Sequence, residues 1–525
     1  MKKIYGILFC TAVLTSCSKE LLETQPNDRY SEEIYWTSEK NAVAALNGCY
    51  AVLKEAGLFG GTATPLWEET ATPNAYNYDN SFGFNVIALG TQTASPANPS
   101  EIINRRWSDS YRGIGRVNTL LAEIDKVPMT DVLKTQMKAE ARFLRGLYYS
   151  LFEMYYGGVP IILDKPNVAT QSDLPRNTRT EVVQQVLKDL DEAAAVLPTK
   201  YTNAADKGRA TKGAALSIKA RVLLFEASPL INTTNDAAKW TTAANAAKAV
   251  MDLATQAGYD LYPNYRNLFL PANENNQEVI FDVQFKAPEQ TGNSFDLIVR
   301  QFNTNAPLRD LIDAYYMKDG LPITESPLYN PAKPYENREP RFYQSIVFPG
   351  DTYLGSVVTP TTPFKITGYT FKKYGIYDNL PSTNILMAGQ SETNYIVMRY
   401  ADILLMYAEA QNEALASPDA SVHAAINRVR QRAGLIPSDV PAGKTKAEMR
   451  EIIRRERRIE FAGEGFYYTD IRRWKIAEQV MNATIFNSEN KAIVKRSFDP
   501  ARDYWWPVPQ TQLDLNRNLT QNANY

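Results

Sequence analysis

Residues 398–410 read MRYADILLMYAEA, and this segment indicates the fold most clearly. Within it, Ile403, Leu404, Tyr407 and Ala408 recur at helical spacing and form one apolar stripe. A stripe of this kind is typical of a helix that buries one face in a protein core. We therefore predict a helix over residues 401–414.

Similar periodic patterns predict further helices, joined by short polar breaks. They cover residues 38–56, 107–124, 132–156, 179–196, 211–227, 241–257, 421–433 and 446–461. Small residues such as Ala139, Gly146, Gly213 and Ala220 lie on faces where paired helices would cross, which permits close packing. The sequence thus predicts a mostly α fold of stacked, tetratricopeptide-like helical hairpins, although no clean repeat of about 34 residues is visible.

Two parts of the chain lack a helical pattern. Residues 60–99 are rich in Gly, Thr, Asn, Pro and aromatic residues, and we expect one long loop or several there. Residues 262–395 are irregular, with short β-type runs at 279–285 and 345–348, and the tail from residue 503 is expected to be extended. The sequence therefore predicts a minor-β, loop-rich region beside the helices.

Composition narrows the classes of function. The formal net charge is −1 over 525 residues, so the chain lacks the basic balance that nucleic-acid binding demands. His423 is the only histidine, which argues against a histidine-based zinc site and removes the usual general base at neutral pH. Cys49 lies in an apolar helical pattern, as a buried core residue would. We predict no catalysis, no cofactor, no metal and no nucleic-acid partner.

The N-terminal residues have the pattern of an export signal. Lys2 and Lys3 precede an apolar run from Ile4 to Leu14, which is too short to span a bilayer. Residues 14–17 read LTSC and resemble a bacterial lipobox. We therefore expect residues 1–16 to be a lipoprotein signal peptide and Cys17 to carry the lipid anchor that holds the protein at the membrane.

Several segments, taken in order, resemble the SusD/RagB family of nutrient-binding outer-membrane lipoproteins. They are AEARFLR at 139–145, YYGGVP at 155–160, GRATKGAA at 208–215, DAYYMKDG at 313–320, REPRF at 338–342, MRYADILLMYAEA at 398–410, INRVR at 426–430, RRERRIE at 454–460 and DIRRW at 470–474. Their order and spacing extend over nearly the whole chain. The resemblance rests on this combination and on the lipobox before it.

The resemblance implies a scaffold of about four tetratricopeptide-like hairpins, with the ligand site in variable loops. It implies an N-terminal helical region at residues 17–260, with a loop insertion at about 60–100, and a C-terminal region at residues 261–525. It also implies a surface-exposed outer-membrane lipoprotein that binds an oligosaccharide or polysaccharide and delivers it to a SusC-like TonB-dependent transporter.

Aromatic and amide residues in two of the irregular segments form the candidate ligand site. Flat rings stack on the apolar face of a sugar, while Asn and Asp hydrogen-bond to its hydroxyl groups. The candidates in the first segment are Trp67, Asn74, Tyr76, Asn77, Tyr78, Asp79 and Phe82, and those in the second are Phe295, Arg300 and Phe302. The alternative is that these rings fill a small core of the loop itself. If they bind ligand, Trp67→Ala or Tyr78→Ala should weaken glycan binding by more than about tenfold and leave the melting temperature nearly unchanged.

Glu456 and Glu460 are spaced like a glycosidase carboxylate pair on one helix face. Four arginines surround them in the sequence RRERRIE, and nearby guanidinium groups favour ionised carboxylates, whereas a general acid needs a raised pKa. We therefore expect structural ion pairs rather than a catalytic dyad.

Three alternatives to glycan binding remain. A RagB-like protein would capture peptides, and a non-catalytic assembly scaffold would bind other proteins through its helices. A surface glycosidase is disfavoured by the carboxylate argument.

Overall fold

The computed structural model describes residues 35–60, 64–80, 83–95, 101–287, 292–378, 381 and 385–525. Within them, every helix predicted from periodicity is present, with ends shifted by a few residues. The longer helices are α2 (Glu39–Ala51), α5 (Glu101–Glu123), α6 (Asp131–Tyr155), α8 (Arg179–Val196), α9 (Lys212–Ala227), α10 (Ala237–Ala257), α14 (Tyr400–Ala414), α15 (Ala420–Arg432) and α16 (Lys446–Glu460). The predicted signal peptide, Cys17 and Phe82 lie outside the described residues.

Side-chain caps explain where several helices begin. Thr178 accepts a hydrogen bond from the backbone N–H of Glu181, whose carboxylate bonds back to the N–H of Thr178. Thr445 and Glu448 form the same capping box at the start of α16. These caps satisfy backbone N–H groups that the first turn of a helix leaves without partners.

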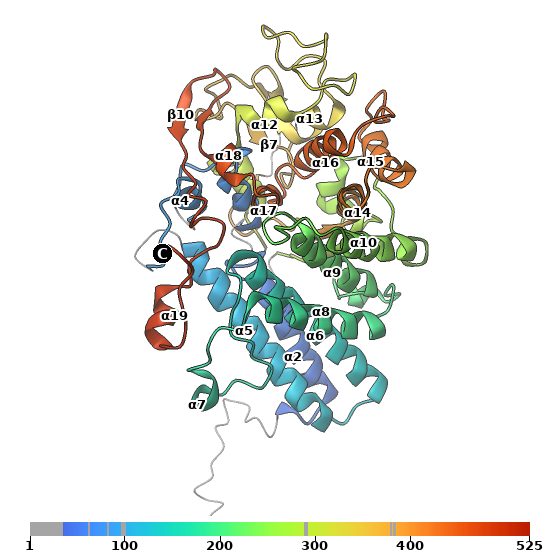
Figure 1. Ribbon diagram of the computed structural model, residues 1–525, viewed down its shortest axis with the longest axis vertical. Coiled ribbons are helices and arrows are strands. Elements are labelled where there is room, and N and C mark those ends of the chain that lie inside the picture. Colours follow the sequence, from blue (N-terminus) through green and yellow to red (C-terminus); the bar gives the residue numbers. More distant parts are fainter. Residues whose placement is uncertain are drawn as a thin grey trace, which may run out of the picture.

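The helices pack in series. Contacts join α5 to α6, α6 to α8, α8 to α9, α9 to α10, α10 to α14, and α14 to both α15 and α16. Figure 1 shows α2, α5, α6 and α8 at one end of the molecule and α9, α10 and α14 in the middle. At the other end lie α16 and two short helices, α12 (Arg309–Ala314) and α13 (Pro340–Ser345). This arrangement confirms the predicted tetratricopeptide-like helical fold.

Short helices occupy the connections between the long ones. The α-helices are α3 (Thr64–Glu68), α4 (Phe84–Ala88), α7 (Val168–Gln171), α11 (Phe295–Leu297), α12 (Arg309–Ala314), α13 (Pro340–Ser345), α17 (Tyr467–Arg473), α18 (Ala477–Met481) and α19 (Gln510–Leu515). Single 3₁₀ turns are η2 (Val52–Lys54), η3 (Glu69–Ala71), η4 (Ile124–Lys126), η5 (Ala204–Asp206), η6 (Asn267–Phe269) and η7 (Pro271–Asn273), and η8 (Ile298–Phe302) is a π-helical turn. Residues 60–99 were expected to be loop and the tail to be extended, but both contain short helices. The sequence did not predict these helices because helices this short contain too few repeats to give a periodic pattern.

The described strands form two-stranded antiparallel sheets. The pairs are β1 (Ala75–Tyr76) with β3 (Ala306–Pro307), β2 (Val279–Val283) with β8 (Tyr395–Arg399), β4 (Ile346–Val347) with β7 (Thr370–Phe371), β5 (Thr352–Tyr353) with β6 (Ser356–Val357), and β9 (Thr484–Phe486) with β10 (Ala492–Lys495). The pairing of β2 with β8 brings together the two ends of the long irregular region, just before α14 begins. That region is therefore an excursion between two packed helices, α10 and α14.

One large hydrophobic core runs through the molecule, from Trp36 to Val508. It includes Trp506 and Cys49, which is buried as predicted. Trp474 is buried in a smaller cluster against α17 and α18. Among the described residues, no helix has both the length and the apolar character needed to cross a bilayer.

Six charged residues form a buried network that we call the charged junction: Glu278, Arg341, Arg399, Arg432, Glu456 and Glu460. Arg341 Nη1 lies 2.5 Å from Glu456 Oε1 and 2.9 Å from Glu460 Oε2. Arg399 Nη1 lies 2.6 Å from Glu460 Oε1 and 2.7 Å from Glu278 Oε1. The structure thus confirms that Glu456 and Glu460 form structural ion pairs.

The electrostatics of Glu460 agree with that role. Burial opposes its ionisation most strongly, but Arg432, Arg399 and Arg341 together outweigh burial and lower the pKa of Glu460 to about 2. A general acid near neutral pH would need the opposite shift.

Candidate functional site

The two candidate segments, more than two hundred residues apart in sequence, meet in space. β1 pairs with β3, so that Tyr76 lies opposite Ala306. Two side-chain hydrogen bonds strengthen this contact: Trp67 Nε1 donates to Thr304 Oγ1 at 3.0 Å, and the Tyr78 hydroxyl donates to the carbonyl of Phe302 at 3.1 Å. We call the surface formed by residues 76–80 and 300–303 the loop surface.

Two aromatic rings of the loop surface face solvent. Tyr78 is 47% exposed and Phe302 is 46% exposed, and Tyr76 beside them is half-buried. Asp79 is exposed next to Tyr78. A large ring that remains half exposed while its backbone is held in place is available for stacking against a ligand.

Other predicted site residues lie inside the molecule, which corrects the expectation for them. Trp67 is only 6% exposed, and Phe295 is fully buried against Phe285, Tyr374 and Tyr395. Their rings fill the core beneath the loops, which is the alternative role for the aromatic residues of these segments.

The two predicted asparagines are also buried, and both form hydrogen bonds with neighbouring backbone or side-chain groups. Asn74 Nδ2 donates to Glu69 at 2.5 Å, while its Oδ1 accepts from Arg458 at 2.7 Å. Asn77 Oδ1 accepts from the backbone N–H of Asp79 at 2.8 Å. These amides therefore hold the loop in shape rather than present themselves to a ligand.

Arg300 connects the loop surface to a third segment, around Leu386, which has no recognisable sequence pattern. Its Nε donates to Asp296 at 3.0 Å and its Nη2 donates to the carbonyl of Leu386 at 2.8 Å. Burial raises the pKa of Asp296, against the opposing effect of Arg300. On either side of Leu386, Ile385 and Met387 are exposed apolar side chains. They lack helical or alternating periodicity, and only the fold shows that they lie next to the arginine.

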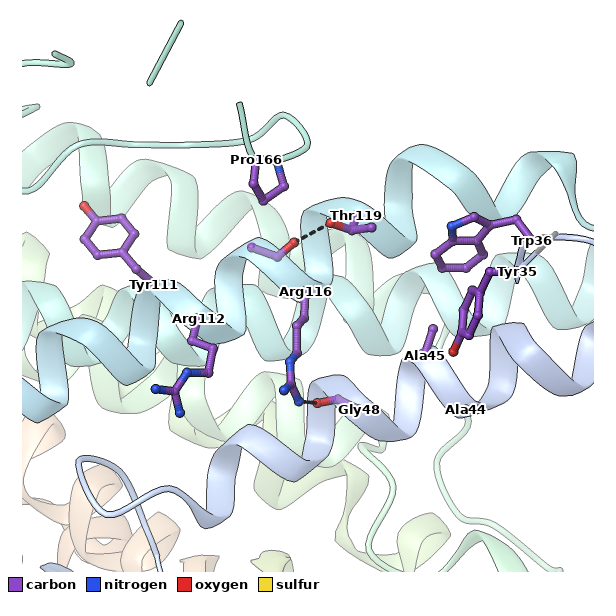
Figure 2. A pocket seen from close by; sticks show the side chains of 11 residues that line it. Tyr35, Trp36, Ala44, Ala45, Gly48, Tyr111, Arg112, Arg116, Thr119 and Pro166 are labelled. Atoms are coloured by element: carbon purple, nitrogen blue, oxygen red, sulfur yellow. Dashed lines mark hydrogen bonds between the residues drawn. The ribbon is translucent and has the colours of Figure 1, made fainter. Parts of the chain in front are cut away.

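A separate groove of about 750 Å³ follows α5 where it faces α2 (Figure 2). Tyr35 and Trp36 lie at one end of it and Tyr111 at the other. Its two arginines are already bonded, because Arg116 donates to the carbonyl of Gly48 at 2.7 Å and Arg112 pairs with Glu55 at 2.9 Å. None of the residues that line this groove was predicted as a site residue, and the loop surface remains the stronger candidate.

The chemistry available at the loop surface is binding. Tyr78 and Phe302 offer ring faces, and the carboxylate of Asp79 offers a hydrogen-bond acceptor, which together suit a neutral polyhydroxylated ligand. Among the described residues, no group of three or more His, Cys, Asp or Glu side chains is arranged to hold a metal ion. The scaffold consists of helical hairpins, and it presents a surface built from separate loops. These features are typical of a binding protein with tetratricopeptide-like architecture.

Comparison with known proteins identifies the family. A model described as the SusD family matches residues 277–525, and one described as "Starch-binding associating with outer membrane" matches residues 28–224. The chain belongs to the SusD/RagB family.

Individual relatives agree over almost the full length. A SusD-like protein of Formosa agariphila is 26% identical over 512 residues, which cover 91% of each chain. A SusD-like protein from Bacteroides fragilis is 27% identical and superposes with a TM-score of 0.78 over 96% of this chain and 100% of that one. A SusD-like carbohydrate-binding protein from the same species is also 27% identical, with a TM-score of 0.80 over 93% of this chain and 100% of that one.

Proposed function

We propose that this protein is a cell-surface lipoprotein that binds an oligosaccharide without altering it and delivers it to a SusC-like TonB-dependent outer-membrane transporter. The observation that carries the proposal is the loop surface, where Tyr78 and Phe302 are both about half exposed and are joined by a hydrogen bond across two distant segments. Rings fixed in this way lose little conformational entropy when a sugar stacks on them.

The surrounding chemistry supports a sugar ligand. The loop surface combines rings with the exposed polar side chains of Asp79 and Asn80, and Arg300 beside them is engaged by Asp296 and Leu386. A surface with few unpaired charges suits a neutral ligand. The carbohydrate-binding relative from Bacteroides fragilis, which matches along its whole length, supports the same ligand class.

The lipid anchor and the transporter are the remaining parts of the proposal. The LTSC sequence at residues 14–17 supports acylation of Cys17, which would tether the helical body to the membrane. Tethering beside a transporter raises the effective concentration of captured ligand and so compensates for modest affinity at an open site.

Isothermal titration against a panel of neutral gluco-, manno-, xylo- and galacto-oligosaccharides tests the binding. We expect saturable heat with one class of glycan, and we expect the double variant Tyr78→Ala with Phe302→Ala to lose that heat. Phe486→Ala, which removes an exposed ring from β9, is the matched control and should bind normally. Silence of the wild-type protein across the panel would count against glycan binding and favour peptide capture or assembly.

A further inference from the structure

A second cleft lies where the end of α2 meets residues 205–209 and the end of β2. Its volume is about 700 Å³, which lies within the range of small-ligand sites. Asn47, Tyr50, Lys54, Arg209 and Gln284 are among the residues that line it. No residue of the loop surface takes part.

Lys54 is the unusual member of this cleft. Its side chain is half-buried, and burial lowers its pKa. Within the part of the chain that the structure describes, its ammonium group makes no ion pair or hydrogen bond and lies only over the ring of Phe285, 5.4 Å from the centroid. A partly desolvated cation without a counter-charge is costly, and an anionic ligand would remove that cost.

The carboxylates near Lys54 are engaged by other groups. Glu55 pairs with Arg112 at 2.9 Å. Asp282 is buried, its pKa is raised to about 6 by desolvation, and it accepts a hydrogen bond from Gln284 Nε2 at 2.6 Å. A second lysine, Lys207, lines the same cleft and is exposed. The cleft therefore offers positive charge that its own acidic residues do not neutralise.

Neutral polar groups complete the cleft. Asn47 Oδ1 accepts a weak hydrogen bond from Arg209 at 3.5 Å, which leaves the amide NH₂ of Asn47 to donate. Gln284 uses its NH₂ group on Asp282 and Asn275, which leaves its Oε1 to accept. A donor and an acceptor in the same cleft as a cation match a ligand that carries one carboxylate and several hydroxyl groups.

We propose that this cleft binds a uronic-acid unit of an oligosaccharide, with the Lys54 ammonium paired to the sugar carboxylate and Asn47 and Gln284 bonded to its hydroxyls. The inference rests on the proposed function and extends it, because it adds an acidic subsite to the neutral loop surface. A neutral sugar in the same cleft would leave Lys54 as unpaired as before.

Isothermal titration with trisaccharides of galacturonate, glucuronate, mannuronate and guluronate, each beside its neutral methyl ester, tests the proposal. At least one acid should bind, and its ester should bind about tenfold more weakly, because a charge-assisted hydrogen bond is lost. Lys54→Met keeps the aliphatic stem and should lose a similar factor, whereas Lys54→Arg should bind within about threefold of the wild type. Lys188→Met, on the exposed face of α8, is the matched control and should bind like the wild type.

The outcomes separate this inference from the proposed function. Equal binding of acid and ester, or normal acid binding by Lys54→Met, overturns the acidic subsite. The same holds if neutral glycans bind through Tyr78 and Phe302 while every acid in the panel is silent. If the wild-type protein binds neither neutral nor acidic glycans, the proposed function fails together with the inference.

Discussion

The charged junction lies inside the molecule and consists of ionic side chains, whereas the loop surface lies outside and presents aromatic rings. Each reverses the usual preference of its residue types. Each is also held in place by partners from distant parts of the chain: Arg399 bridges β8 to α16, and Tyr78 bonds to Phe302. The comparison shows that the role of a residue in this protein depends on whether its interacting groups already have partners within the fold. The buried charges satisfy one another, while the exposed rings keep their faces open.

The largest effect should come from breaking the charged junction at Arg399. Its guanidinium bonds to the carboxylates of Glu278, Glu460 and Glu464, so Arg399→Ala removes one cation that these three buried carboxylates share and leaves the cluster with uncompensated negative charge. We expect the free energy of unfolding to fall by about 5 kcal/mol, measured by urea denaturation.

Arg428→Ala is the control for that variant. Arg428 forms an ion pair with Asp260, but both side chains are about half exposed, and the loss should stay below about 1 kcal/mol. If the two variants lose the same unfolding free energy, the buried ion pairs of the charged junction stabilise the protein no more than an exposed ion pair does.

The second largest effect should be a difference in stability between variants of two aromatic residues in the same segment. Trp67→Ala opens a cavity beneath the loops and removes the hydrogen bond to Thr304, so it should cost about 4 kcal/mol of unfolding free energy. Tyr78→Ala, eleven positions away and exposed, should cost no more than about 0.5 kcal/mol. Thermal denaturation of both variants measures this difference. Native stability in Trp67→Ala, combined with lost glycan binding, would return Trp67 to the ligand site.

Acid should weaken the charged junction through Glu460. The folded state lowers the pKa of Glu460 from 4.5 to about 2, so its stabilising contribution is complete above the unfolded pKa. That contribution is lost as the pH falls from about 4.5 towards 2, and it amounts to roughly 3 kcal/mol. Urea denaturation between about pH 5 and pH 3 should show the loss, and Glu460→Gln should flatten it.

Glu451→Gln provides the comparison on the same helix, because the Glu451 side chain is 72% exposed. Its stability should follow the wild-type dependence on pH. If Glu460→Gln retains the full acid sensitivity of the wild type, the ionisation of Glu460 is not its source.

Local sequence determined the helices but not the surfaces between segments. The stripe at Ile403, Leu404 and Tyr407 is a property of one helix, and periodicity therefore located α14 within a residue. The ionic role of Glu456 and Glu460 also followed from neighbouring arginines, although their actual partners, Arg341 and Arg399, come from elsewhere in the chain.

The candidate site was only partly predictable, because burial in a loop depends on contacts across the fold. Trp67 and Tyr78 carry the same signal in sequence, a large ring among polar residues, yet one faces Thr304 in the core and the other faces solvent. The exposed side chains of Ile385 and Met387 join the region through Arg300, a contact that no local pattern encodes. Lys54 likewise lacks a counter-charge only because of where Glu55 and Asp282 point.

The smallest effect distinguishes the ring of Tyr78 from its hydroxyl group. Tyr78→Phe keeps the ring and removes the 3.1 Å hydrogen bond to Phe302, which is exposed and therefore weak. We expect glycan affinity to fall by only about two- to threefold in Tyr78→Phe but by more than about tenfold in Tyr78→Ala, as measured by isothermal titration. If the two variants lose the same affinity, the hydroxyl group that positions Phe302 accounts for the whole effect, and the face of Tyr78 does not contact the sugar. If only the alanine variant loses affinity, the ring itself is the contact, and the hydrogen bond to Phe302 contributes nothing measurable to binding.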